Sequence, residues 1–376
     1  MDHPEKKSAT QPPRLLVLGG GFAGVWAAIA AAEAAAALGP VQIDVVSPDD
    51  RFVPRPRLYE SAPADTARSL RGILGPRGIG HLRAQATDID DAARTVTIVD
   101  DAGTEDELLY DRLILATGSQ LRRPPIDAAH LHDIDTLPAA EALDRRLAEL
   151  PEHAIVVVVG AGFVGIELAC ELPTRVPSAH VVLLERSDVI APELGANPRP
   201  EIEAALHELK IETRTGVTIA GFDGSTVTLD DGGSFPADVV VWTAGMSASP
   251  LTATLSTDLD PLGRLDVDQY LRVQDVPFVF AAGDTAAPLD EAGHPVAQSA
   301  QHAIPQGSCA GRNAVADLHG VELIELTTLP YGTCLDLGAA GAVFTEGWER
   351  QVRLVGDDAK AIKNDITTTW LYPPSA

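Results

Sequence analysis

The chain has 376 residues, which is enough for two or three domains. Its 28 basic and 54 acidic residues give a formal net charge of −26, which argues against a nucleic acid or an anionic membrane surface as the partner. The hydrophobic fraction of 45% is typical of a globular protein, and the three cysteines are too few for a disulfide framework. We therefore expect a cytoplasmic protein.

A strand, a glycine turn and a helix are predicted at the start of the chain. Residues 14–18 form an apolar run that predicts a buried strand, and an apolar helix is expected to continue to Ala36. Between them the turn reads Gly19-Gly20-Gly21-Phe22-Ala23-Gly24. In this G-x-G-x-x-G pattern the first glycine permits a tight turn, the second lets backbone N–H groups approach a pyrophosphate, and the third lets helix and strand pack closely.

The same unit returns later in the chain. Residues 154–159 predict a strand, a helix is expected to continue to Leu172, and residues 180–184 predict the next strand. The turn between the first two elements reads Gly160-Ala161-Gly162-Phe163-Val164-Gly165. Two copies, each framed by a strand and a helix, are far more specific than a lone match.

An acid ends the second copy. Glu185 follows Gly165 by 20 residues, where a carboxylate accepts hydrogen bonds from a ribose 2′-OH and repels a 2′-phosphate. The sequence therefore favours NADH over NADPH, although the adjacent Arg186 could soften that preference. No metal-ligand pattern is recognised.

Further segments complete an ordered set of motifs. Residues 110–115 predict a strand that ends in Ala116-Thr117-Gly118, residues 241–245 read V-W-T-A-G, and the strand predicted at 277–282 ends in Gly283-Asp284. This order resembles the pyridine-nucleotide/FAD oxidoreductases with two dinucleotide-binding domains, over roughly residues 14–318. Residues 56–60, 160–167 and 297–303 make the chain most similar to the type II NADH dehydrogenase group.

The resemblance implies an α/β fold with two nested Rossmann-like domains. It places an FAD-binding domain at 14–125 and 247–320, an NAD(P)H-binding domain at 126–246, and a small C-terminal interface segment at 321–376 that lies over the flavin. The implied cofactors are FAD and NADH, with NADPH less favoured.

The resemblance also implies which residues bind the cofactors. Gly19, Gly21 and Gly24 would hold the FAD pyrophosphate, and Asp284 its ribityl or phosphate part. Where the family has an acid for the adenosine ribose, this chain has Ser47, so an empty first site is the alternative. The full cofactor-binding set is Gly19, Gly21, Phe22, Ala23, Gly24, Ser47, Pro56, Ala116, Thr117, Gly118, Gly160, Gly162, Phe163, Val164, Gly165, Glu185, Gly245, Gly283 and Asp284.

Three residues are candidates for catalysis. Glu167 is expected in the first turn of the second glycine-loop helix, as a nicotinamide-positioning group, a proton relay, or merely an acid that stabilises the helix N-terminus. Gln298 and His302 match a stretch that lies beside the quinone site in the family, on a helix expected to begin near Val296. His302 could deliver a proton to a reduced quinone, or could be a solvated helix residue.

The electron acceptor is constrained mainly by what is missing. Residues 51–60 contain no cysteine pair of the kind that disulfide reductases use, and we interpret Cys170, Cys309 and Cys334 as packed thiols in preference to a redox pair of the last two. We expect a quinone-like small-molecule acceptor. The alternatives are an NADH-binding redox sensor with slow turnover, a reductase of an iron–sulfur carrier, or a biosynthetic tailoring flavoenzyme.

The chain termini carry no predicted membrane segment. Residues 1–13 lack the apolar core of a signal peptide, and residues 321–376 show no amphipathic basic helix. We therefore expect no membrane association, or only a peripheral one. The oligomeric state is open, with a homodimer as one possibility.

Overall fold

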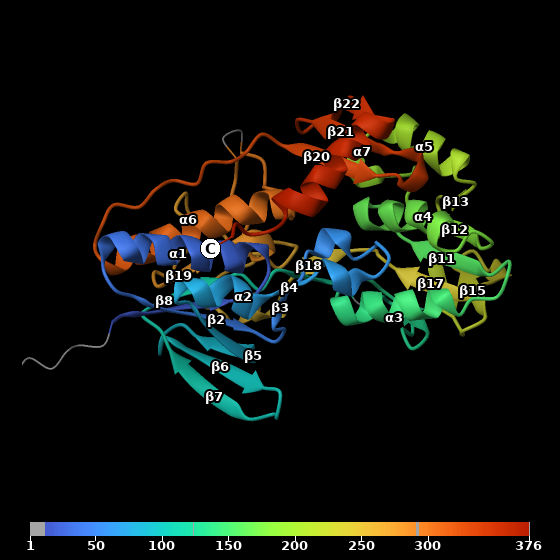
Figure 1. Cartoon of the computed structure of the whole chain (residues 1–376). Helices are drawn as coiled ribbons and strands as arrows, with labels where there is room; N and C mark the ends of the chain where they lie inside the picture. Colours follow the sequence, from blue (N-terminus) through green and yellow to red (C-terminus); the bar gives the residue numbers. More distant parts are fainter. Residues whose placement is uncertain (1–11, 123, 291–292, 376) are drawn as a thin grey trace, which may run out of the picture.

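The computed structural model describes residues 12–122, 124–290 and 293–375. Its first layer is a seven-stranded sheet in the order β19-β8-β1-β2-β5-β6-β7. The first five of these strands pair in parallel, and β6 and β7 extend the sheet as an antiparallel arm (Figure 1). The strands are β1 (Arg14–Leu18), β2 (Gln42–Ser47), β5 (Gly80–Asp90), β6 (Thr95–Asp100), β7 (Glu105–Leu109), β8 (Arg112–Leu115) and β19 (Val279–Ala281).

Two long helices pack side by side on this sheet. They are α1 (Phe22–Leu38) and α6 (Ala300–Leu318), which lie together in Figure 1. A Cβ atom at Gly307 would lie 2.2 Å from the carbonyl oxygen of Ala23, and one at Gly311 would lie 2.1 Å from that of Ala27. Only glycine therefore allows the two helix backbones to approach this closely. The short helix α2 (Leu70–Leu74) and the hairpin of β3 (Arg51–Phe52) and β4 (Arg68–Ser69) lie near the end of β2.

The second layer is a five-stranded parallel sheet in the order β10-β17-β11-β12-β13. The chain enters it through β9 (Ser119–Leu121) and leaves through β18 (Met246–Ala248), which pair antiparallel where the two layers meet. The strands are β10 (Leu131–His132), β11 (Ile155–Val159), β12 (His180–Leu184), β13 (Glu212–Arg214) and β17 (Val239–Trp242). The other elements are α3 (Leu137–Ala148), α4 (Phe163–Arg175), α5 (Arg199–Glu208), β14 (Ile219–Phe222), β15 (Thr226–Leu229) and β16 (Ser234–Pro236).

The C-terminal segment packs mainly on α4 of the second layer, as Figure 1 shows. It consists of the antiparallel strands β20 (Gly332–Asp336), β21 (Ala342–Glu346) and β22 (Gln351–Val355), the helix α7 (Gly356–Asp365) and a π-helical turn (Ile366–Trp370). Leu335 and Val343 share one buried cluster with Val156 and Ile166 of the second layer. The hydrophobic effect therefore holds these strands on the second layer.

The predicted α/β class is confirmed, and the two glycine loops sit in the predicted strand–turn–helix units. Two predicted boundaries were wrong, because α4 continues to Arg175 past Pro173 and α6 begins at Ala300 rather than near Val296. Helix α1 ends at Leu38, and Gly39 is its C-cap. Within the described ranges, no helix is both long and apolar enough to cross a bilayer. The predicted domain boundaries stay predictions.

Candidate functional site

The first glycine loop lies at the carboxyl end of β1 and leads into α1. A Cβ at Gly24 would lie 1.9 Å from the carbonyl oxygen of Gly19, so the third glycine is needed for helix–strand packing. A Cβ at Gly21 would meet no atom within 4 Å. The middle glycine thus opens onto space, and Phe22 and Ala23 begin the helix beside it. This arrangement fits the pyrophosphate of FAD, which would use the N–H groups and positive end of α1.

Polar groups surround this loop. Ser47 is 4% exposed and lies against the loop. A Cβ at Gly20 would lie 2.7 Å from the Ser47 Oγ atom. The Thr117 hydroxyl is buried without a hydrogen-bond partner in the described structure. An unpaired buried hydroxyl is costly, so its presence fits a ligand that would pair with it. Ala116, before it, contacts Gly19: a Cβ at that glycine would lie 2.2 Å from the Ala116 carbonyl oxygen.

Three other predicted residues come together at the end of β19. Asp284 accepts a hydrogen bond from the Ser119 hydroxyl at 2.5 Å, and its backbone carbonyl accepts one from Gln298 Nε2 at 3.1 Å. The Gly283 N–H donates to Gln306 Oε1 at 2.7 Å. Gln298 therefore orients the loop that carries Asp284, just before the N-terminus of α6.

The remaining first-loop candidates lie where the layers meet. Gly118 (φ +70°) and Gly245 (φ +82°) occupy left-handed backbone positions at the two crossings between the sheets. Pro56 lies in a 3₁₀ turn, and the preceding Arg55 donates to the Ser119 carbonyl at 2.9 Å. This turn is therefore attached to the chain that follows Gly118.

The second glycine loop repeats the geometry of the first. A Cβ at Gly165 would lie 1.8 Å from the Gly160 carbonyl oxygen, whereas at Gly162 the nearest atom would be Glu193 Oε2 at 3.4 Å. Phe163 is half-buried and Val164 is 43% exposed at the start of α4. The loop therefore has room for a second pyrophosphate.

Glu185 closes this loop from the end of β12. Its carboxylate accepts hydrogen bonds from the Ala161 N–H at 2.9 Å and the Ser187 N–H at 2.8 Å, and the residue is 7% exposed. Two backbone donors therefore fix the carboxylate at the end of β12, beside the second glycine loop. Arg186 is exposed and forms no described ion pair with this carboxylate.

Glu167 lies elsewhere than predicted. Because α4 begins at Phe163, Glu167 falls in the second helical turn, and it is only 6% exposed. Its Oε1 accepts from Lys363 Nζ at 2.6 Å and from the Asp336 N–H at 3.1 Å. Burial raises the pKa of Glu167, which the Lys363 ammonium opposes. Burial alone would lower the pKa of Lys363, but the Glu167 carboxylate raises it, so the lysine stays charged.

A second ion pair adjoins the first. Asp336 accepts from Lys360 Nζ at 2.5 Å and from the Tyr59 hydroxyl at 2.9 Å. Burial, Glu167 and Asp336 together raise the pKa of Tyr59 far above its ordinary value, so the phenol keeps its proton. The sequence analysis did not identify these four partners. The available signal was that Lys360 and Lys363 are the two lysines of the tail and stand three residues apart, on one helix face.

His302 is buried rather than solvated, so the alternative of an exposed helix residue was wrong. Its Nδ1 lies 2.9 Å from the Ser299 hydroxyl, and its ring stacks on Tyr331 with centroids 5.7 Å apart. Burial lowers the pKa of His302, which keeps the imidazole neutral at pH 7. Gln301, beside it, donates to the carbonyl of Pro330 at 3.1 Å.

The three cysteines are free thiols. Cys170 and Cys309 are buried and Cys334 is half-buried. Burial raises the pKa of Cys309 and of Cys334 to about 11, so both are protonated at neutral pH. The packed-thiol interpretation agrees with this state.

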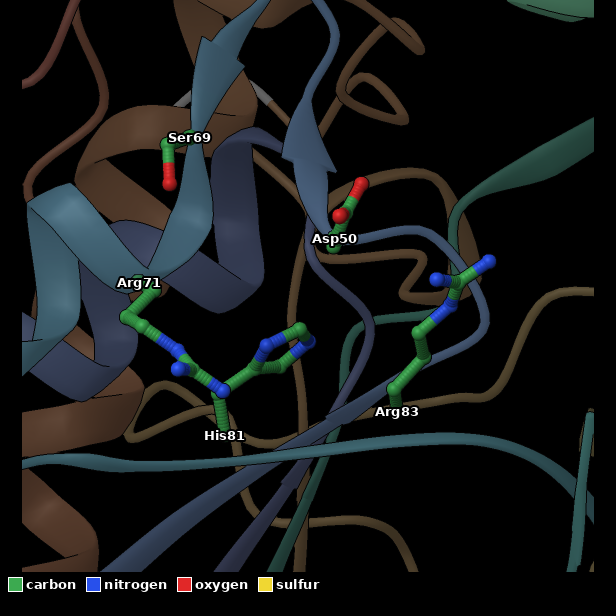
Figure 2. Close-up of a pocket in the computed structure, with 5 residues that line it drawn as sticks. All are labelled: Asp50, Ser69, Arg71, His81 and Arg83. Carbon is green, nitrogen blue, oxygen red and sulfur yellow. The ribbon is translucent and has the colours of Figure 1, made fainter.

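A cavity of about 440 Å³ lies near the end of β2 (Figure 2). Its lining residues are Asp50, Ser69, Arg71, His81 and Arg83, and Figure 2 shows Arg71 extending toward His81. Arg83 pairs in register with Ser47, which places the cavity next to the predicted adenosine ribose position. The His81 Nε2 atom is buried without a described partner. The cavity thus places polar side chains near this position, Arg71, His81 and Arg83 among them, that the motif analysis did not identify.

The chain matches known proteins over most of its length. A family described as pyridine nucleotide-disulphide oxidoreductase matches residues 13–307. An NADH dehydrogenase-like protein of Mycobacterium tuberculosis is 43% identical over 96% of this chain and 94% of its own length. A demethylphylloquinone reductase of Synechocystis is 30% identical over 89% of this chain and 86% of its own. The structure of NDH2 from Plasmodium falciparum in complex with NADH has the same fold, with a TM-score of 0.78 at 14% identity, over 96% of this chain and 95% of that one.

Proposed function

The chain belongs to the pyridine nucleotide-disulphide oxidoreductase family, and from that premise we propose that it passes electrons from NADH through FAD to a quinone-like small molecule. It is an NAD(P)H oxidoreductase of the NADH dehydrogenase-like group and uses FAD and NADH. The proposed acceptor is supported by the relative that is named a demethylphylloquinone reductase.

The observation that carries the proposal is the pair of glycine loops that open onto space at Gly21 and Gly162. We assign FAD to the first loop, within residues 14–125 and 247–320, and NADH to the second, within residues 126–246. Glu185, held by two backbone N–H groups, favours the ribose of NADH. FAD, when bound, supplies the redox centre between donor and acceptor.

The C-terminal segment holds a buried acid of α4, Glu167, through Lys363. Reduction of a quinone to its quinol by NADH takes up one proton in addition to the hydride. Glu167 is a buried acid with a raised pKa, and Lys363 holds its carboxylate at a fixed place. We assign to Glu167 the role of holding that proton. We assign to His302 and Gln298 the role of shaping the N-terminal end of α6.

Anaerobic reduction tests the proposal directly. The purified protein is expected to contain FAD, to lose its visible flavin absorbance with NADH, and to regain it faster with a soluble quinone than with air. The Glu167→Gln variant is expected to slow reoxidation by quinone more than reduction by NADH. Glu171→Gln, one helical turn later and half-buried, is the matched control.

Each alternative has its own outcome in this assay. A stable reduced protein that no acceptor reoxidises would favour the redox-sensor hypothesis and exclude quinone reduction. Faster reoxidation by a ferredoxin than by any quinone would favour the carrier-reductase hypothesis. Turnover with quinones above about 1 s⁻¹, the low end of ordinary enzymes, would exclude the sensor.

A further inference from the structure

The turn between β21 and β22 is held against the nicotinamide-binding layer. Asn197, just before α5, donates its Nδ2 hydrogen to the Glu349 carbonyl at 2.6 Å. The next residue, Arg350, has a φ of +48°, in the left-handed region that a non-glycine residue rarely adopts. The turn therefore has a defined conformation that aims one cationic side chain.

That side chain lies beside the start of α4. The Arg350 guanidinium carbon is 5.9 Å from the ring centroid of Phe163, the residue that follows Gly162. It is also 5.4 Å from the ring centroid of Tyr331, and its Nη2 donates to the Tyr331 hydroxyl at 3.0 Å. Two aromatic rings thus fix the guanidinium next to the second glycine loop.

The guanidinium is incompletely satisfied. Its Nε is buried without a hydrogen-bond partner in the described structure, and no described carboxylate lies within ion-pair distance of Arg350. A buried charged donor without an acceptor is costly. Arginine presents its N–H groups as a planar fork that matches phosphate oxygens. A phosphate oxygen would satisfy this donor.

We infer that Arg350 binds the pyrophosphate of NADH. The inference rests on the proposed binding of NADH at the second glycine loop. The N-terminus of α4 would attract the pyrophosphate, but Glu193, whose Oε2 would lie 3.4 Å from a Cβ at Gly162, repels it. Arg350 supplies the opposite charge at the same loop. The C-terminal segment would then contribute to donor binding as well as to the Glu167 ion pair.

The test compares variants of the FAD-loaded protein. Calorimetry measures the dissociation constants of ADP-ribose, which has the pyrophosphate but no nicotinamide, and of NAD⁺. Stopped-flow absorbance measures flavin reduction against NADH concentration. Arg350→Gln is expected to raise the dissociation constants of both ligands about 10-fold or more, and the saturating reduction rate should change less. Arg350→Lys should show a smaller increase.

The matched control is Arg353→Gln, on β22 of the same hairpin, which removes an exposed ion pair with Glu346. Equal weakening by both variants, or unchanged ADP-ribose binding in Arg350→Gln, would overturn the assignment to the pyrophosphate. If Arg350→Gln fails to retain FAD, Arg350→Lys carries the same comparison. A wild-type holoprotein that binds neither ADP-ribose nor NADH would instead reject the proposed function, and the role of Arg350 with it.

Discussion

Removal of the Lys363 ammonium is the most informative single change in this molecule. Lys363→Met keeps a long apolar side chain but leaves Glu167 without its cation, in a site where the two side chains are only 7% and 8% exposed. The Asp336 N–H would be its remaining described donor, and the Asp336 carboxylate would repel it. Glu167 is therefore expected to take up a proton in the folded variant.

The pH sets the size of the effect. At about 1.4 kcal/mol per pH unit, keeping Glu167 neutral at pH 7, rather than ionised with its ordinary pKa of 4.5, costs about 3.5 kcal/mol. At pH 5.5 the same cost is about 1.4 kcal/mol. A carboxyl group whose folded-state pKa is raised destabilises the protein increasingly as pH rises above its unfolded-state value. The variant should therefore lose least stability under acidic conditions.

Urea unfolding followed by tryptophan fluorescence, at pH 5.5 and pH 7.0, measures this difference. The double variant Glu167→Gln/Lys363→Met should recover part of the loss at pH 7.0, because it buries no charge at this position. A loss that is equal at both pH values, together with no recovery in the double variant, would show that the buried carboxylate is not its cause.

Three further predictions concern the cofactor loops and the buried histidine. Gly21→Ala should fold but bind FAD about 10-fold or more weakly, whereas Gly24→Ala, with its Cβ 1.9 Å from a carbonyl oxygen, should accumulate little folded protein. Flavin content and the melting temperature of the apoprotein distinguish these results, and wild-type FAD affinity in Gly21→Ala would contradict the loop assignment. Glu185→Gln should reduce the preference for NADH over NADPH, measured as the ratio of kcat/KM values, and an unchanged ratio would remove Glu185 from the ribose site. Because burial lowers the pKa of His302 below its ordinary 6.5, the unfolded chain binds more protons there than the folded one as pH falls through 6.5. The free energy of unfolding should therefore decrease as the pH is lowered through this window, and its slope against pH should be smaller in His302→Gln. Equal slopes in the two proteins would show that this imidazole does not contribute.

The C-terminal segment contacts both layers, and its expected position over the flavin stays a prediction. Its core residues Leu335 and Val343 pack on the second layer, and the ring of Tyr372 packs against Phe52 of β3. Its lysines then reach Glu167 and Asp336 from α7. This placement explains why a short segment without a predicted membrane helix can still contribute charged groups to the site.

Local sequence determined the frame of this protein. Apolar runs such as β1 and β11 specify buried parallel strands, because the constraints act within a few bonds. Glycines such as Gly24 and Gly165 specify turns in which a Cβ would overlap a backbone carbonyl. The acid at Glu185 followed from spacing alone, and the structure places it against the Ala161 N–H. These features depend on backbone geometry and on the spacing of residues along the chain, and both can be read from a single segment.

Only the tertiary structure decided the environment of the ionisable groups. Glu167 and Lys363 are 196 residues apart, and their pairing depends on how α7 packs on α4. The burial of His302 depends on Tyr331, and the position of Arg350 depends on a turn held by Asn197. Desolvation and charge pairing are set by whatever covers a side chain, and these covering residues come from distant segments. No pattern within one segment records that contact.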